Sequence, residues 1–197
     1  MSSFALLLLL AAGVLAFIFV KTLQKDGMKI ASDPKNENNM LQAKNAEIED
    51  AFTKTMRRAD NAFEEGAYFD AESALETALR MQPENEIVLG KLAYVLEKQE
   101  DYKAAAAIYD KALETHKNSV SLLASYARMS YSQGDKDKAK ELYIKAVGLE
   151  PYEPTIYYDF SNLLLEFGEK DAAKQGFERA LELDRKFQPA IDALAKL

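Results

Sequence analysis

The sequence predicts an all-α protein in which a row of helix pairs follows one apolar N-terminal helix. Three observations lead to this fold class. Small residues recur every 34 residues through most of the chain, residues 1–20 carry no charged side chain, and a polar segment lies between these two regions. Apolar residues make up 48% of the 197 residues and charged residues 29%, a balance typical of globular proteins.

The composition argues against several classes of function. The formal net charge is −7, and an acidic surface repels phosphate backbones, so we expect no nucleic-acid partner. Cysteine is absent, which excludes disulfides, thiolate chemistry and most structural zinc sites.

Residues 1–23 form the first predicted element, a transmembrane anchor. Phe4–Val20 holds 17 uncharged and mostly apolar residues, which as a helix cover about 25 Å of a hydrocarbon core about 30 Å thick. The residues up to Leu23 extend the span, with the Lys21 ammonium reaching the interface. A cleaved signal peptide is the alternative; however, the apolar run continues past Ala16, where cleavage would fall, and no basic residue precedes it.

The lysines that flank the apolar segment predict its orientation. Lys21, Lys25 and Lys29 follow it, whereas only the terminal amine precedes it. Because positive charges favour the cytoplasmic side, we expect the rest of the chain in the cytoplasm, with the bacterial inner membrane as the membrane.

Residues 24–50 form a polar segment that we expect to be partly helical. Asp33 is a candidate N-cap with Pro34 at the first helical position. From Leu41 to Phe63 apolar residues recur at intervals of three, four and seven, which predicts a long amphipathic helix. A flexible spacer up to about residue 45 is the alternative, because the start of this region is so polar.

Residues 51–197 carry the repeat. When the chain is written in rows of 34 residues, equivalent positions fall in one column. Gly66, Gly134 and Gly168 share a column at a predicted turn, in which Glu100 is the exception. Glycine accepts backbone angles that residues with a side chain resist. Small side chains let helices approach closely, and a large side chain fills the gap between them. Three columns are small and one is large: Ala59, Ala93, Ala127 and Ser161; Ala71, Ala105, Ala139 and Ala173; Ala78, Ala112, Ala146 and Ala180; and Leu75, Tyr109, Tyr143 and Phe177.

This pattern resembles the tetratricopeptide repeat family. The resemblance covers residues 52–185 and implies a right-handed α-solenoid of four helix pairs. Thr55 and Arg58 depart from it in the first repeat, where the other repeats place apolar residues, and Lys117 and Arg185 replace proline. The implied repeats are about 52–85, 86–119, 120–153 and 154–187.

Residues 188–197 continue the phase of the repeat. Ile191 and Ala195 stand 34 residues after Tyr157 and Ser161. We therefore predict a capping helix that shields the last repeat.

We find no pattern typical of an enzyme, a cofactor site or a metal site. The single histidine, His116, ends a helix, where a cation favours the helix dipole. Asp135-Lys136-Asp137 lacks the glycine and glutamate of a calcium loop, so we interpret it as a solvated turn.

The resemblance implies a concave groove, lined by the first helix of each repeat, that grips a protein or peptide segment. Aromatic anchors mixed with charged and amide side chains are typical of binding hot spots. Gly90 and Ala124 are expected to leave room for the ligand. The groove residues are Met56, Asp60, Phe63, Tyr94, Glu97, Arg128, Tyr131, Tyr158 and Asn162.

Family members that hold the C-terminal carboxylate of heat-shock chaperones use lysine, asparagine and arginine at five set positions. This chain places Met56, Asp60, Lys91, Ser121 and Ser125 there, which disfavours that role. The chain is instead similar to membrane-anchored tetratricopeptide proteins that assist the assembly or regulation of bacterial membrane or envelope complexes. The alternatives are a receptor for precursors on the mitochondrial outer membrane and a periplasmic protein with a cleaved signal.

Overall fold

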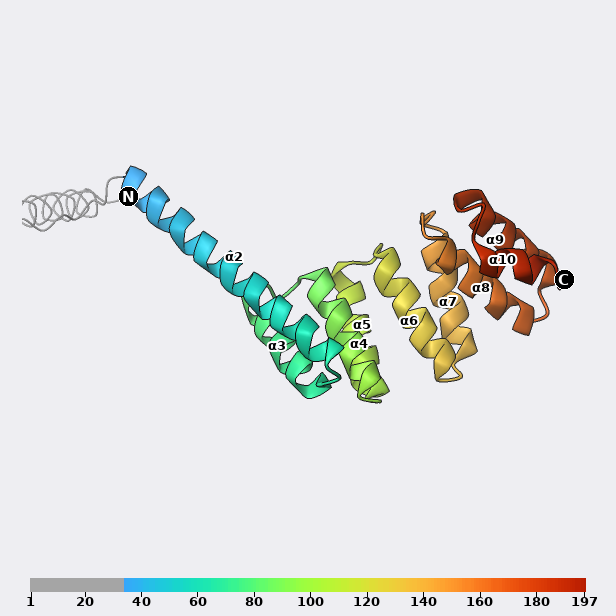
Figure 1. The fold of residues 1–197 in the computed structure, drawn as a ribbon, viewed down its shortest axis with the longest axis horizontal. Coiled ribbons are helices and arrows are strands. Elements are labelled where there is room, and N and C mark those ends of the chain that lie inside the picture. Colours follow the sequence, from blue (N-terminus) through green and yellow to red (C-terminus); the bar gives the residue numbers. More distant parts are fainter. Residues whose placement is uncertain (1–33) are drawn as a thin grey trace, which may run out of the picture. The chain divides into compact units, whose positions relative to one another are not determined.

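The computed structural model describes the backbone of residues 34–197 and the side chains of residues 38–197. All regular elements in this part of the chain are α-helices (Figure 1). They are α2 (Pro34–Glu64), α3 (Tyr68–Met81), α4 (Glu86–Lys98), α5 (Tyr102–Thr115), α6 (Val120–Ser132), α7 (Lys136–Val147), α8 (Pro154–Glu166), α9 (Lys170–Leu183) and α10 (Gln188–Leu194).

The predicted transmembrane anchor, residues 1–23, lies outside the described residues, as do Lys25 and Lys29. Among the helices that the structure does describe, none has both the length and the apolar character needed to cross a membrane.

The amphipathic helix predicted from Leu41 to Phe63 forms part of α2, which already begins at Pro34. The chain divides into two units between Ala51 and Phe52. In the described part of the first unit, the apolar side chains of Met40, Leu41 and Ile48 are exposed.

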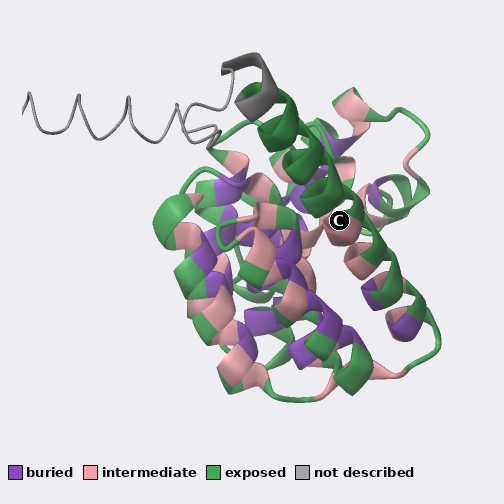
Figure 2. Cartoon of the chain, turned by 90° about the vertical axis from the view of Figure 1, so that its left-hand side faces the viewer, coloured by how far each residue is buried: buried purple, intermediate pink, exposed green. Residues whose placement is uncertain are grey.

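The second unit is a succession of helix pairs. Helix α4 packs on α5, α6 on α7 and α8 on α9, while the contacts of α3 with α4 and of α7 with α8 join one pair to the next. Buried residues lie on the helix faces that are turned toward neighbouring helices, and exposed residues lie on the outer faces (Figure 2).

The columns of the 34-residue repeat form the core. All eight alanines of the two columns on the second helices, α3, α5, α7 and α9, are 0% exposed. The large residue one turn after the first of these columns is buried in every repeat: Leu75, Tyr109, Tyr143 and Phe177. Burial of one such side chain contributes about 2 kcal/mol to stability.

The turns of the glycine column have the backbone conformation expected from the sequence. Gly66, Gly134 and Gly168 have φ of +75°, +82° and +77°, and Glu100 adopts the same left-handed conformation with φ of +64°. The solvated turn predicted at Asp135-Lys136-Asp137 is instead the start of α7: the Asp135 carboxylate accepts a hydrogen bond from the Lys138 amide as N-cap, and Lys136 and Asp137 are the first helical residues.

Helix α10 covers the end of the last pair. Ala190 is 0% exposed, and Phe187 and Leu194 pack in the same apolar cluster as Phe177. Ile191 differs from its counterpart Tyr157: Ile191 is 37% exposed and Tyr157 only 8%. The face of α10 that carries Ile191 is therefore more open than the equivalent face of α8.

Candidate protein-binding groove

Three adjoining cavities lie between the first helices of consecutive pairs, and we call them together the groove. The first, of about 280 Å³, lies between α2 and α4; the central one, of about 400 Å³, between α4 and α6; and the third, of about 160 Å³, between α6 and α8. Tyr94 lines the first and the central cavities, while Ser125 and Arg128 line the central and the third. The shared residues show that the three cavities are next to one another.

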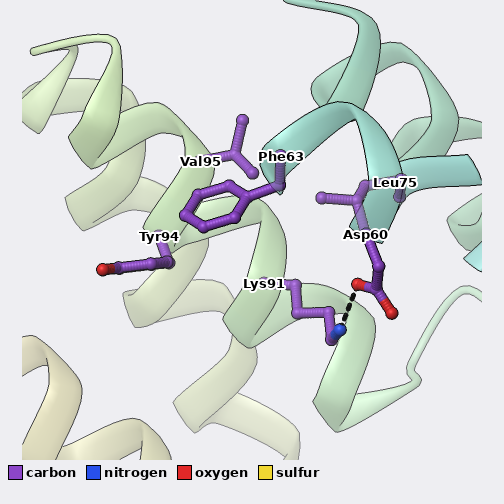
Figure 3. Close-up of a pocket in the computed structure, with 7 residues that line it drawn as sticks. Asp60, Phe63, Leu75, Lys91, Tyr94 and Val95 are labelled. Atoms are coloured by element: carbon purple, nitrogen blue, oxygen red, sulfur yellow. Dashed lines mark hydrogen bonds and ion pairs between the residues drawn. The ribbon is translucent and has the colours of Figure 1, made fainter. Parts of the chain in front are cut away.

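The first cavity is mostly apolar. The ring centroid of Phe63 lies 5.3 Å from that of Tyr94, and Leu75 and Val95 complete the apolar lining (Figure 3). The Lys91 ammonium in α4 donates to the Asp60 carboxylate in α2, as the dashed line in Figure 3 marks. Tyr94 is 42% exposed, so its ring offers an aromatic surface to a ligand.

The central cavity is polar and charged. Burial raises the pKa of the Glu97 carboxyl, although the Lys98 and Arg128 cations act in the opposite direction. The Lys98 ammonium lies 4.8 Å from the centroid of the Tyr94 ring, a cation–π contact. Arg128 donates to the Ser125 hydroxyl over 3.3 Å.

The third cavity adds a second half-buried carboxylate. Burial raises the pKa of Asp159 in α8, while the Arg128 guanidinium lowers it in part. Arg128 thus interacts with a carboxylate from the preceding helix pair and with one from the following pair.

The structure brings five of the nine predicted groove residues to these cavities: Asp60, Phe63, Tyr94, Glu97 and Arg128. Met56 is instead partly buried and packs against the core. Tyr131 lines none of the three cavities, and its hydroxyl donates to Glu166, which also pairs with Lys136 at 2.6 Å.

Tyr158 and Asn162 lie in a separate cavity of about 520 Å³ between α8 and α10. The Tyr158 ring packs on Phe177 and Phe187, with centroids 5.7 and 5.6 Å away. This ring therefore helps to hold the last pair to α10, besides lining a cavity.

The expectation for Gly90 is wrong, whereas Ala124 does line the third cavity. A Cβ added to Gly90 would lie 3.3 Å from Cδ2 of Leu122, so a side chain of α6 already occupies the space beside this glycine. Gly90 serves the packing of α4 on α6.

Lys91, Ser125 and Asp159 are not among the groove residues predicted from the sequence. These residues line the groove and stand 34 positions apart, so they form one column directly after Gly90, Ala124 and Tyr158. A search for polar side chains in the columns next to the predicted ones would have found them.

Other polar residues have structural partners. His116 is the C-cap of α5, and its Nε2 lies 2.7 Å from the Glu84 carbonyl oxygen. Among the described residues, no group of three or more histidine, aspartate or glutamate side chains could hold a metal ion.

Two family models, both described as tetratricopeptide repeat, match the chain. One covers residues 56–120 and the other residues 130–197, so together they span more than half of it. No curated protein sequence matches at a significant level.

Solved structures share the fold. A tetratricopeptide repeat protein from Parabacteroides merdae has 22% identity and a TM-score of 0.63 over 72% of this chain, which spans only 56% of that protein. Pseudomonas aeruginosa pilF has 22% identity and a TM-score of 0.68 over 76% of this chain and 68% of its own. The structure of Naa15/Naa10 bound to HypK-THB has 21% identity and a TM-score of 0.62 over 74% of this chain and 22% of the other. At such identities the likeness shows the fold alone.

Proposed function

The chain belongs to the tetratricopeptide repeat family, and from this premise we propose that it is a docking scaffold whose groove holds a segment of another protein. One observation carries the proposal: three adjoining cavities, which share Tyr94, Ser125 and Arg128, run across successive first helices. A row of adjoining subsites fits an extended or helical segment better than a compact small molecule.

The lining has the character of a protein-binding surface. Tyr94 presents a partly exposed ring between an apolar cavity and a charged one, and aromatic anchors beside arginine are typical of binding hot spots. Among the structural neighbours, Naa15/Naa10 is bound to HypK-THB, so one protein that shares this fold is part of a complex. The net charge of −7 favours a partner segment with basic residues.

We further propose that residues 1–23 anchor the scaffold in a membrane, with the repeats on the cytoplasmic side. The support is the uncharged run Phe4–Val20 and the lysines that follow it. In this arrangement the scaffold assists the assembly or regulation of a bacterial membrane or envelope complex. A mitochondrial import receptor and a periplasmic protein with a cleaved signal are the alternatives.

Photo-crosslinking in cells tests the docking function. A photoreactive phenylalanine analogue replaces Lys98, an exposed residue at the central cavity, and in matched controls replaces Lys111 or Glu178, which are exposed on second helices. We expect a discrete protein adduct from position 98 and none from the controls. Adducts from the control positions alone would place the partner on the other face and refute the proposal.

Two further measurements test the anchor and its orientation. Mass spectrometry of the membrane fraction should find peptides N-terminal to Lys21, whereas a mature N-terminus near Phe17 would mean a cleaved signal peptide. Protease added to sealed spheroplasts should leave residues 51–197 intact; their digestion would contradict the cytoplasmic orientation.

A further inference from the structure

The first part of α2 is a helix whose side chains lie open to solvent. Every described side chain from Asn38 to Asp50 is exposed, including the apolar Leu41 at 56% and Ile48 at 43%. A helix of this length is marginal in water on its own, because most helical stability in proteins comes from the packing of an apolar face. This part of α2 thus has an apolar surface that a partner would stabilise by covering it.

Leu41 and Ile48 belong to an apolar stripe that runs along one face of α2. Phe52 and Met56 continue this stripe at intervals of four residues, and both pack against the core. A stripe of this periodicity is typical of a helix face that packs against another element. The stripe is therefore packed in the C-terminal part of α2 and exposed in the N-terminal part.

The exposed part of the stripe fits a heptad, written abcdefg, with Leu41 and Ile48 at successive d positions. Asn45 then falls at the a position between them, and Asn38 at the preceding a position. Residues at a and d form the seam of a coiled coil, and asparagine at a specifies its register and number of strands at some cost in stability. Phe52, at the next a position, already packs against the core, so the exposed seam ends before it.

Two residues of opposite charge flank this seam. Lys44 occupies position g, and Glu49 occupies position e of the next heptad. In a parallel pair of helices, the g residue of one helix lies opposite the e residue five positions later on the other, so Lys44 of each copy meets Glu49 of the other copy. On a single helix, surface neighbours are three or four positions apart and not five, so this complementarity arises only between two helices. An antiparallel pair sets g against g and e against e, which does not bring the two charges together.

We propose that residues 38–50 pair with the same segment of a second copy of this chain as a parallel, two-stranded coiled coil. Leu41 and Ile48 form its apolar layers, Asn45 sets its register, and two ion pairs of Lys44 with Glu49 flank it. The parallel direction agrees with the proposed anchor, because two chains held in one membrane by residues 1–23 run the same way. The pairing itself depends neither on the anchor nor on the docking function, and it would join two scaffolds in one assembly.

Disulfide crosslinking of the full chain tests whether the seam is an interface. The native sequence has no cysteine, so Asn45→Cys introduces a single thiol in the seam. The matched control is Ala43→Cys, which places the thiol at position f on the other side of the helix, where Ala43 is also exposed. Under mild oxidation in a non-ionic detergent, we expect most of the Asn45→Cys chains to form a disulfide-linked dimer and few of the Ala43→Cys chains to do so.

Charge reversal tests the parallel direction. Lys44→Glu sets two glutamates together at each flank of the pair, and Glu49→Lys sets two lysines together. Since both flanks change at once, each variant should dimerise about tenfold more weakly than the native chain, as sedimentation equilibrium in the same detergent measures. A mixture of the two variants restores both ion pairs, so we expect heterodimers in preference to either homodimer. Glu47→Lys, at the outer position c, is the control and should dimerise like the native chain.

Three results would overturn the proposal. A monomeric chain, with no disulfide-linked dimer from Asn45→Cys, would mean that two copies do not pair through this face. Equal crosslinking at positions 43 and 45 would mean random collision. A dimer that neither Lys44→Glu nor Glu49→Lys weakens would mean an antiparallel pair or a different interface. The groove variant Tyr94→Ala should leave the dimer unchanged, so failure of the docking function and failure of the pairing are distinguishable.

Discussion

Gly176 of α9 lies so close to Ser161 of α8 that an added Cβ would come within 2.0 Å of the serine Oγ. The Ser161 hydroxyl donates to the Tyr157 carbonyl oxygen over 2.7 Å, and Ser161 is 0% exposed, so the hydroxyl has little room to move. The last repeat therefore combines a serine in the small-residue column of its first helix with a glycine in the facing helix.

Gly176→Ala should lower the free energy of unfolding by about 1–2 kcal/mol, because the clash outweighs the gain in helix propensity. Ser161→Ala removes the Oγ and restores the alanine of the other repeats, so the double variant Gly176→Ala/Ser161→Ala should be at least as stable as the native chain. Urea unfolding of the four proteins measures this coupling. Additive effects of the two substitutions would contradict the close contact.

Glu100→Gly should stabilise the chain. Glu100 has φ of +64°, a left-handed conformation that costs an L residue about 1 kcal/mol and costs glycine little. The melting temperature should rise by roughly 2–4 °C for a domain of this size. Gly134→Ala, in the same column, replaces a glycine that has positive φ and should lower the melting temperature. A lower melting temperature with Glu100→Gly would mean that the Glu100 side chain has a stabilising role.

Asp159→Asn should raise the melting temperature at pH 7, and the gain should shrink toward pH 4. Burial raises the pKa of this carboxyl, so the folded state binds the proton more tightly than the unfolded state. Unfolding free energy therefore falls as pH rises through the folded-state pKa, and asparagine removes that loss. Thermal melts of the variant and the native chain at both pH values measure the difference in melting temperature. Glu178→Gln, which changes an exposed carboxylate, is the control. An equal difference at both pH values would mean that titration is not the cause.

Deletion of residues 188–197 should lower the melting temperature by several degrees and promote aggregation. Helix α10 buries Ala190 and covers the cluster that contains Phe177 and Phe187, so its removal exposes apolar surface. Deletion of residues 195–197 alone, which are exposed, is the control and should change little. A truncated chain with an unchanged melting temperature would show that α10 is not a cap.

Much of the fold follows from the sequence because helix periodicity decides which side chains meet. A side chain in a repeated column has the same position in every repeat, so four alanines at one column predict four close helix contacts. The same logic gave the correct turn at Glu100, where the backbone keeps the left-handed angle although glycine is missing.

The site was less predictable, because a column indicates which face of a helix a residue occupies and not what covers that face. Tyr158 occupies a groove column, yet Phe177 and Phe187 pack against its ring. Tyr131 also occupies one, but its hydroxyl bonds to Glu166 of the next repeat. Such contacts depend on how neighbouring pairs stack, which the repeat columns by themselves do not specify.

The environment of the Tyr109 hydroxyl, which has no hydrogen-bond partner in the described chain, also does not follow from the sequence pattern. Its column predicts a buried packing residue, and the ring is indeed fully buried. Whether the hydroxyl finds a partner depends on the positions of Glu97 and Ser125 on two other helices, which only the packed structure gives.

The most direct test of the docking function is the crosslinked adduct at position 98 in the presence of Tyr94→Ala. Tyr94 lines two of the three cavities, and truncation of an aromatic anchor weakens binding by about 2 kcal/mol, roughly 30-fold. Tyr152→Ala, which removes a ring that is 88% exposed outside the groove, is the matched control. We expect that Tyr94→Ala abolishes the adduct and that Tyr152→Ala leaves it unchanged. A full yield of adduct with Tyr94→Ala, in a chain whose helical signal is native, would contradict the docking function.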